Sequence, residues 1–317
     1  MNLRRSFRIG VGWIIVALAA VSLSAQEPVF TLRVDVPLVS VDVRVLDSRQ
    51  QPMTSLTVKD FIVVEDGVEQ EIHSFSSIDT PYNIILLFDR SGSTQEQWTF
   101  MQRAADRFIR NLRPQDRVSL AAFDEGVTML SSWSESRSVT QQALNELTER
   151  GPGGGTNLYQ SVDRVTQREF RNMSGRRAVV ILTDGQDSQL RQRRSNKDDI
   201  AFQRTVAVIQ AARIPLYFVA LNTDKNPGSG FYFSEAFLKE ARTRMELLAA
   251  VSGGGIFFPK NIRDIVGVYD QVSRDLSSSY SLAYTSSHPS IPGQIHRIEV
   301  RVHGARVIQS RETYTTP

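Results

Sequence analysis

The chain has 317 residues, of which 41% are hydrophobic and 22% are charged, and its formal net charge is +3. This is the composition of an ordinary globular protein, long enough for one large domain and a smaller one. The chain contains no cysteine, which excludes disulfide frameworks, thiolate zinc sites and cysteine nucleophiles. No basic stripe interleaved with aromatic residues is present, so we expect no nucleic-acid partner.

The first 25 residues have the three parts of an export signal. Three arginines lie within the first eight residues, residues 9–20 are apolar, and small residues follow. This pattern predicts a signal peptide over residues 1–25 and an exported protein, either periplasmic or secreted. An uncleaved segment would instead anchor the chain to the membrane, although its apolar part is slightly short for a spanning helix.

Residues 26–80 carry the signals of a small antiparallel β unit. Valines alternate with other residues between Val34 and Val45, and period-two spacing of β-branched residues is typical of half-buried strands. Asp66-Gly67 separates two apolar runs and predicts a tight β-hairpin there.

The pattern changes at residue 84, where five consecutive apolar residues predict a strand buried on both faces of a parallel sheet. Further strands are predicted at 118–123, 127–130, 177–183, 215–221 and 256–258. Helices are predicted at 97–112, 139–147, 158–170, 200–212, 246–251 and 262–276. This alternation predicts an α/β domain over residues 81–276, with a doubly wound, mostly parallel sheet covered on both faces.

Residues 277–317 return to the strand pattern, with apolar alternation over 280–284 and 295–302. No helix is predicted between these strands. We therefore expect them to pair with the N-terminal β segment in a small antiparallel β-sandwich, with the α/β domain inserted in it or beside it.

Three loops place oxygen-bearing side chains where predicted strands end or a helix begins. They are Asp89-Arg90-Ser91-Gly92-Ser93, Gly153-Gly154-Gly155-Thr156-Asn157 and Thr183-Asp184-Gly185. Ligands of open α/β sheets bind outside the carboxyl ends of the strands. Asp89 and Asp184 are therefore expected at one edge of the sheet.

Two carboxylates and three hydroxyls in these loops are all hard oxygen donors. Such a set suits Mg²⁺, with Mn²⁺ or Ca²⁺ as alternatives, and does not suit zinc or copper. Alternate positions in residues 89–93 let one tight turn direct several oxygens to one point, and the glycines allow close backbone approach. An ion with few charged ligands gains by accepting an anionic oxygen, such as an Asp or Glu carboxylate of a partner protein.

Asp89-x-Ser91-x-Ser93, with Thr156 in a Gly-Gly-Thr-Asn context and Asp184 in a Leu-Thr-Asp-Gly context, resembles the metal-ion-dependent adhesion site of von Willebrand factor A (VWA) domains. The resemblance covers about residues 82–276 and implies a Rossmann-like, six-stranded sheet. It implies that the two serines and the threonine ligate the metal directly, and the two aspartates directly or through water.

The chain also resembles the VWFA-related Acidobacterial domain family, in the segment from Leu56 to Gly67 and in the strand from Tyr280 to Tyr284. That narrower resemblance implies no defined biochemical role.

The predicted function is therefore an exported, metal-dependent protein-binding module of the adhesion type, and not an enzyme. One alternative is a structural envelope protein with a vestigial metal site, and another is a metal-dependent phosphohydrolase that uses Asp89. A serine nucleophile at Ser91 has no evident base, because all four histidines lie in the flanking β segments.

Four further features have more than one interpretation. Arg90 could screen charge or pair with a partner, and Asp187 is interpreted as a helix N-cap rather than a group behind the metal ligands. Trp98 and Trp133 are interpreted as packing residues rather than partner contacts. Residues 231–233 are either an exposed aromatic surface or a buried one.

Overall fold

The computed structural model describes residues 38–133, 136–149, 151, 153–171, 173, 175–188, 200–221, 234–259, 262–288 and 291–316. These all belong to one compact unit, residues 36–317. The predicted signal peptide and the aromatic residues 231–233 lie outside the described residues. Within the described ranges, no helix combines the length and the apolar character that crossing a membrane requires.

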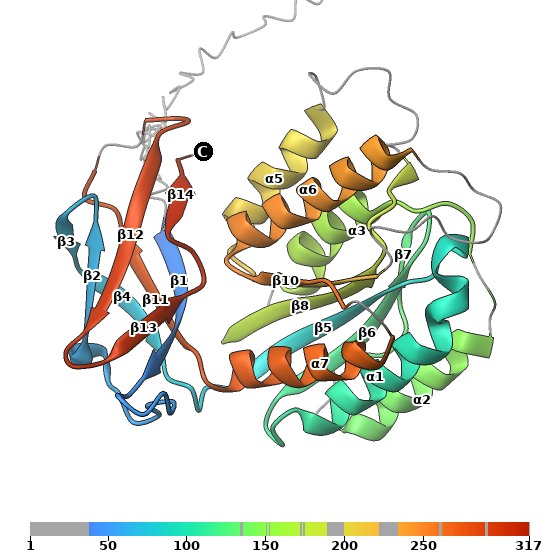
Figure 1. Cartoon of the computed structure of the whole chain (residues 1–317), viewed down its shortest axis with the longest axis horizontal. Coiled ribbons are helices and arrows are strands. Elements are labelled where there is room, and N and C mark those ends of the chain that lie inside the picture. The colour runs from blue at the N-terminus through green and yellow to red at the C-terminus, as the bar shows by residue number, and fades with distance from the viewer. Residues whose placement is uncertain are drawn as a thin grey trace, which may run out of the picture. The chain divides into compact units, whose positions relative to one another are not determined.

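A six-stranded sheet with the order β10-β9-β8-β5-β6-β7 forms the centre of the α/β domain (Figure 1). Its strands are β5 (Tyr82–Asp89), β6 (Arg117–Phe123), β7 (Val127–Met129), β8 (Arg176–Thr183), β9 (Leu216–Ala220) and β10 (Gly255–Phe257). All neighbours pair in parallel except β7, which runs antiparallel to β6. The predicted mostly parallel, six-stranded sheet is confirmed.

Helices cover both faces of this sheet, with α1, α2 and α7 on one face and α3, α5 and α6 on the other (Figure 1). They are α1 (Trp98–Asn111), α2 (Arg137–Glu149), α3 (Leu158–Arg164), α5 (Ile200–Ala212), α6 (Glu235–Ser252) and α7 (Ile262–Ser277). A 3-10 turn, η2 (Gly92–Gln97), precedes α1, and a π turn, η3 (Val165–Glu169), follows α3. Every residue of β5 is buried, because its alternate side chains enter the cores on opposite faces.

The strands before and after the α/β domain form a β-sandwich of two four-stranded sheets, ordered β13-β1-β11-β4 and β14-β12-β2-β3. Their bounds are β1 (Leu38–Leu46), β2 (Phe61–Glu65), β3 (Val68–Gln70), β4 (Ile72–Ser76), β11 (Tyr280–Thr285), β12 (Ile295–Val302), β13 (Arg306–Gln309) and β14 (Thr313–Thr315). A short 3-10 turn, η1 (Val58–Asp60), leads into β2. Since β1 pairs with β11 and β2 with β12, the α/β domain is inserted between β4 and β11.

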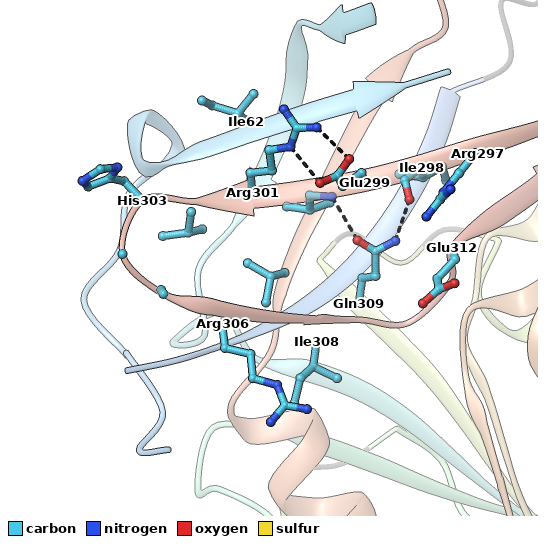
Figure 2. Close-up of a pocket in the computed structure, with 15 residues that line it drawn as sticks. Ile62, Arg297, Ile298, Glu299, Arg301, His303, Arg306, Ile308, Gln309 and Glu312 are labelled. Atoms are coloured by element: carbon cyan, nitrogen blue, oxygen red, sulfur yellow. Dashed lines mark hydrogen bonds and ion pairs between the residues drawn. The ribbon is translucent and has the colours of Figure 1, made fainter. Parts of the chain in front are cut away.

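The consecutive strands β12 and β13 enter different sheets of the sandwich. A cavity of about 820 Å³ lies where they diverge. Figure 2 shows Gln309 on β13 reaching toward β12. Its Oε1 accepts a hydrogen bond from the Val300 N–H at 2.9 Å, and its Nε2 donates to the Ile298 carbonyl oxygen at 2.7 Å. This amide satisfies backbone groups of β12 that lack a strand partner there.

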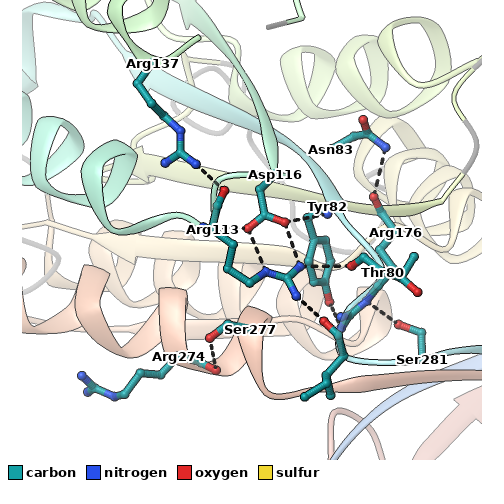
Figure 3. Close-up of polar contacts among 11 residues, drawn as sticks. Thr80, Tyr82, Asn83, Arg113, Asp116, Arg137, Arg176, Arg274, Ser277 and Ser281 are labelled. Atoms are coloured by element: carbon teal, nitrogen blue, oxygen red, sulfur yellow. Dashed lines mark hydrogen bonds and ion pairs between the residues drawn. The ribbon is translucent and has the colours of Figure 1, made fainter. Parts of the chain in front are cut away.

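A polar network around Asp116 fixes the start of β5 (Figure 3). The Asp116 carboxylate accepts hydrogen bonds from the Tyr82 N–H at 2.9 Å and from the Arg113 guanidinium at 2.7 Å. Arg113 also donates to the carbonyl oxygen of Thr80 at 3.0 Å, and to that of Ile78. The segment that leads from the sandwich into β5 is therefore held by the turn that precedes β6.

Candidate metal centre

The strand order puts the two predicted aspartates at the same edge of the sheet. β5 pairs in parallel with β6 on one side and with β8 on the other, so the chain changes direction in the sheet between β5 and β8. Loops that leave such neighbouring strands diverge to opposite faces and open a crevice. Asp89 ends β5, and Asp184 directly follows β8.

Four of the five predicted ligands form a connected set of contacts. The Ser91 N–H donates to Asp89 Oδ1 at 2.9 Å, and the hydroxyl oxygens of Ser91 and Ser93 lie 3.1 Å apart. The Ser93 hydroxyl hydrogen-bonds Asp184. Across the strand pair, Thr183 Oγ1 donates to Asp89 Oδ2 at 2.6 Å.

The loop that carries Thr156 is joined to both of the other loops. Thr156 is buried; its N–H donates to Ser188 Oγ at 2.8 Å, and the Ser188 N–H donates to the Thr156 carbonyl oxygen at 2.7 Å. The Gly153 N–H donates to the Arg90 carbonyl oxygen at 2.8 Å. A Cβ on Gly153 would lie 2.2 Å from Asp124 Oδ2, so this approach requires glycine.

The two carboxylates are buried, with 0% of Asp89 and 3% of Asp184 exposed. Burial, together with the nearby charge of Asp184, raises the pKa of Asp89 to about 7, although hydrogen bonds from Ser91 and Thr183 oppose this shift. Burial also raises the pKa of Asp184, against hydrogen bonds from the Ser93 hydroxyl and the Gln186 N–H. Near neutral pH, the crevice holds its two negative charges only at a free-energy cost unless a proton or a cation compensates them.

The donors in the crevice fit a divalent cation. Asp184 Oδ2 is buried and has no hydrogen-bond partner among the described residues, so it has a lone pair to offer. Its neighbours are hydroxyl and carboxylate oxygens, the hard donors that Mg²⁺, Mn²⁺ and Ca²⁺ accept. Such an ion would supply the positive charge that two buried carboxylates require.

Two functional residues of the crevice were missed from the sequence. Thr183 lies in the third predicted loop but was not counted as an oxygen donor, although its hydroxyl fixes Asp89. Asp124 follows β6 and forms an ion pair with Arg90, so Arg90 pairs with a carboxylate of its own chain. An aspartate directly after a predicted apolar strand was the available signal for Asp124.

Three residues with two interpretations have defined contacts. The Asp187 carboxylate accepts a hydrogen bond from the Tyr159 N–H at 3.3 Å, in the first turn of α3, so it caps a helix from outside that helix. Trp98 is buried and donates its Nε1–H to Thr94 Oγ1 at 3.1 Å. Trp133 packs on Phe170 with ring centroids 5.3 Å apart. Both tryptophans are packing residues.

A sequence model of the von Willebrand factor type A domain matches residues 84–186, the segment that supplies β5, β6, β8 and all five predicted ligands. The chain contains a VWA domain. A solved VWA structure from Catenulispora acidiphila is similar, with a TM-score of 0.51 and 13% identity over 81% of this chain and 74% of that one. At this identity, the likeness supports the fold of the VWA domain and nothing finer.

A second solved structure is the vWF domain of a type V pili tip protein from Porphyromonas gingivalis. It has a TM-score of 0.45 and 11% identity over 62% of this chain and 94% of that one. The narrower resemblance to the Acidobacterial family stays a prediction.

Proposed function

We propose that the crevice between β5 and β8 holds one Mg²⁺ ion, through which the VWA domain binds an Asp or Glu carboxylate of a partner protein. The residues that hold the ion are Asp89, Ser91, Ser93, Thr156 and Asp184. The single observation that carries the proposal is the pair of buried carboxylates in which Asp184 Oδ2 has no donor among the described residues. Buried charge of this kind requires a compensating cation.

The donor set also favours a carboxylate as the partner group. Three of the five donors are uncharged hydroxyls, so the ion would keep much of its positive charge. Mg²⁺ usually retains several waters when a protein supplies few carboxylates, and an anionic oxygen from outside replaces one of these waters favourably. The chain's own residues hold the ion and leave a coordination position for the partner.

Mn²⁺ binding tests the metal site, because Mn²⁺ accepts the same hard oxygens and is paramagnetic. We expect Mg²⁺ to displace one bound Mn²⁺ per chain. This Mn²⁺ should bind at least ~10-fold more weakly to Asp89→Ala, since loss of groups around a metal ligand already costs this much. The matched control is Asp79→Ala, an exposed aspartate before β5, whose affinity should equal that of the unaltered chain. Equal binding by Asp89→Ala would overturn the proposal.

A second experiment tests the open coordination position. Water-proton relaxation of the Mn²⁺-loaded chain should fall when acetate or an aspartate-containing peptide is added, because the carboxylate displaces a bound water. The corresponding asparagine peptide should leave the relaxation unchanged. Relaxation that no carboxylate alters contradicts carboxylate recognition, and Asp89-dependent turnover of a phosphate ester would favour the phosphohydrolase instead.

Export is the second part of the proposal. It is supported by the positive, apolar and small-residue regions of residues 1–25. Fractionation of cells that express the whole chain should place it outside the cytoplasm. Replacing Arg4, Arg5 and Arg8 with glutamate should retain it inside, and export of that variant at the normal level would contradict the prediction.

A further inference from the structure

A second group of metal-ligand side chains lies in the β-sandwich, outside the VWA domain. Glu65, Asp66 and His288 each offer one ligand atom, and these three atoms lie within 4.8 Å of one another. Glu65 and Asp66 come from the end of β2, whereas His288 follows β11 more than 200 positions later in the chain. The pairing of N-terminal and C-terminal strands brings them together.

The β2–β3 hairpin holds Asp66 in one orientation. Asp66 and Gly67 both have positive φ, at 48° and 87°, as a two-residue type I′ turn requires. One Asp66 oxygen, Oδ1, accepts a hydrogen bond from the Arg297 N–H at 2.8 Å, and the other, Oδ2, lies 2.7 Å from His296 Nδ1. His288 Nε2 lies 3.3 Å from the Glu65 carbonyl oxygen, at the same end of the strand.

The Glu65 carboxylate gives independent evidence for a ligand. Glu65 is 0% exposed, and its Oε1 accepts hydrogen bonds from the Ser286 hydroxyl at 2.6 Å and the Tyr314 hydroxyl at 2.9 Å. Its Oε2 is buried and accepts no hydrogen bond of ordinary geometry among the described residues, with the Tyr284 hydroxyl as its polar neighbour. A buried carboxylate oxygen without a donor is costly unless a cation approaches it.

We propose that Glu65, Asp66 and His288 bind a second divalent cation, of the zinc class. One imidazole with two carboxylates suits Zn²⁺, whereas the all-oxygen site of the VWA domain suits Mg²⁺. Asp66 is exposed and His288 is half-buried, so the ion can enter from solvent and take water as its remaining ligand.

His296 is a positioning residue for this site. It is buried, and its ring centroid lies 5.6 Å from that of His288 and 5.1 Å from that of Tyr314. Its Nδ1 contacts the Asp66 carboxylate. A histidine that hydrogen-bonds a ligating carboxylate fixes the direction of that carboxylate and tunes its basicity.

Zinc titration in an Asp89→Ala background tests the site, because this substitution removes a ligand of the proposed VWA metal site. With a chromophoric chelator as competitor, we expect one Zn²⁺ per chain. His288→Ala should weaken this binding at least ~10-fold. His303→Ala and His73→Ala, which remove exposed histidines of the same sandwich, should bind as the background does, and circular dichroism should show that all variants fold.

Zinc K-edge absorption gives a second readout that does not depend on the variants. It should report one imidazole nitrogen among oxygen ligands at ~2.0–2.2 Å. The proposal is overturned if the Asp89→Ala chain binds no Zn²⁺, if His288→Ala and His303→Ala bind equally, or if the spectrum lacks imidazole. None of these results bears on the Mg²⁺ site, because the zinc titration uses chains that already lack Asp89.

Discussion

Asp89 and Asp184 share one crevice away from water, and their mutual repulsion makes the metal-free domain sensitive to pH. Burial and the Asp184 charge raise the pKa of Asp89 from 3.8 to about 7. A carboxyl whose pKa is higher in the folded than in the unfolded state contributes stability that is fully present below pH 3.8. That contribution is lost as the pH rises through about 7.

Because Asp89 loses its proton as the pH rises, the stabilisation of the domain by Mg²⁺ should depend on pH. Mg²⁺ competes with the proton on Asp89, so the rise in Tm that Mg²⁺ causes should be small at pH 5.5 and larger at pH 8. Asp89→Asn carries no titrating proton at this position and should reduce this dependence to the part that comes from Asp184. Thermal unfolding with and without Mg²⁺ measures both, and a Mg²⁺ effect that decreases toward pH 8 would contradict the prediction.

Asp116 is another buried carboxylate, and an arginine of the same chain compensates its charge. It is 3% exposed and accepts hydrogen bonds from the Tyr82 N–H and the Arg113 guanidinium. Asp116→Ala would leave both donors without this acceptor, so we expect the free energy of unfolding to fall by ~3 kcal/mol. Asp79→Ala, which removes an exposed carboxylate, should change it by less than ~0.5 kcal/mol in urea unfolding.

The sequence predicts which polar side chains follow buried strands, because strand ends can be recognised locally. The contacts among Asp89, Ser91, Ser93 and Asp184 lie at the expected sheet edge, although the bound metal stays a prediction. The ion pair of Arg90 with Asp124 and the sandwich cluster of Glu65 with His288 could not be predicted. They depend on which strands become neighbours, and that is decided by packing between distant segments.

Among the elements, the buried strands were the most predictable and α6 the least. Continuous apolar runs identify β5 and β8, because both of their faces are covered. Only residues 246–251, in the last third of α6, were predicted as helix. Its first half buries Leu238 and Ala241 among polar residues, so its apolar periodicity is weak. The stronger local signal was its start, where the Ser234 side chain accepts a hydrogen bond from the Phe237 N–H.

Two glycines, Gly254 and Gly267, should respond oppositely to substitution by alanine. A Cβ on Gly254, between α6 and β10, would lie 2.0 Å from the Leu216 carbonyl oxygen in the adjacent strand β9. Because backbone cannot move aside as a flexible side chain can, Gly254→Ala should destabilise the chain by ~3 kcal/mol. Gly267 lies within α7, where an added Cβ meets nothing within 4 Å. Gly267→Ala should therefore stabilise the chain by ~0.5–1 kcal/mol.

Urea unfolding of the two variants measures both effects. Since α7 packs on α1 and β9, the Gly267→Ala result also reports whether this helix keeps its conformation on substitution. A destabilising effect of Gly267→Ala would contradict the expected gain, and an unfolding midpoint of Gly254→Ala equal to that of the unaltered chain would contradict the expected clash.

At the scale of the whole molecule, the VWA domain and the sandwich have separate hydrophobic cores. The sandwich core joins the valines of β1 to Phe61, Tyr280 and Ile298, and none of these belongs to the two cores of the α/β sheet. The links between them include the Arg44–Asp275 ion pair, whose side chains are 30% and 18% exposed, and a hydrogen bond from the buried Arg176 to Ser281 Oγ at 3.3 Å. Partly buried polar contacts of this kind contribute ~0.5–1.5 kcal/mol each, and we expect that they do not enforce common unfolding.

Calorimetry should therefore resolve two transitions that respond to different ions. Mg²⁺ at about 100 times its Kd stabilises the state that binds it by ~2.7 kcal/mol. For a domain of this size, that raises Tm by ~5–10 °C. Mg²⁺ should move only the VWA transition, and Zn²⁺ only the sandwich transition. Asp89→Ala should abolish the first shift and leave the second, whereas His288→Ala should do the reverse. A single transition that both ions shift together would mean that the two cores unfold as one unit.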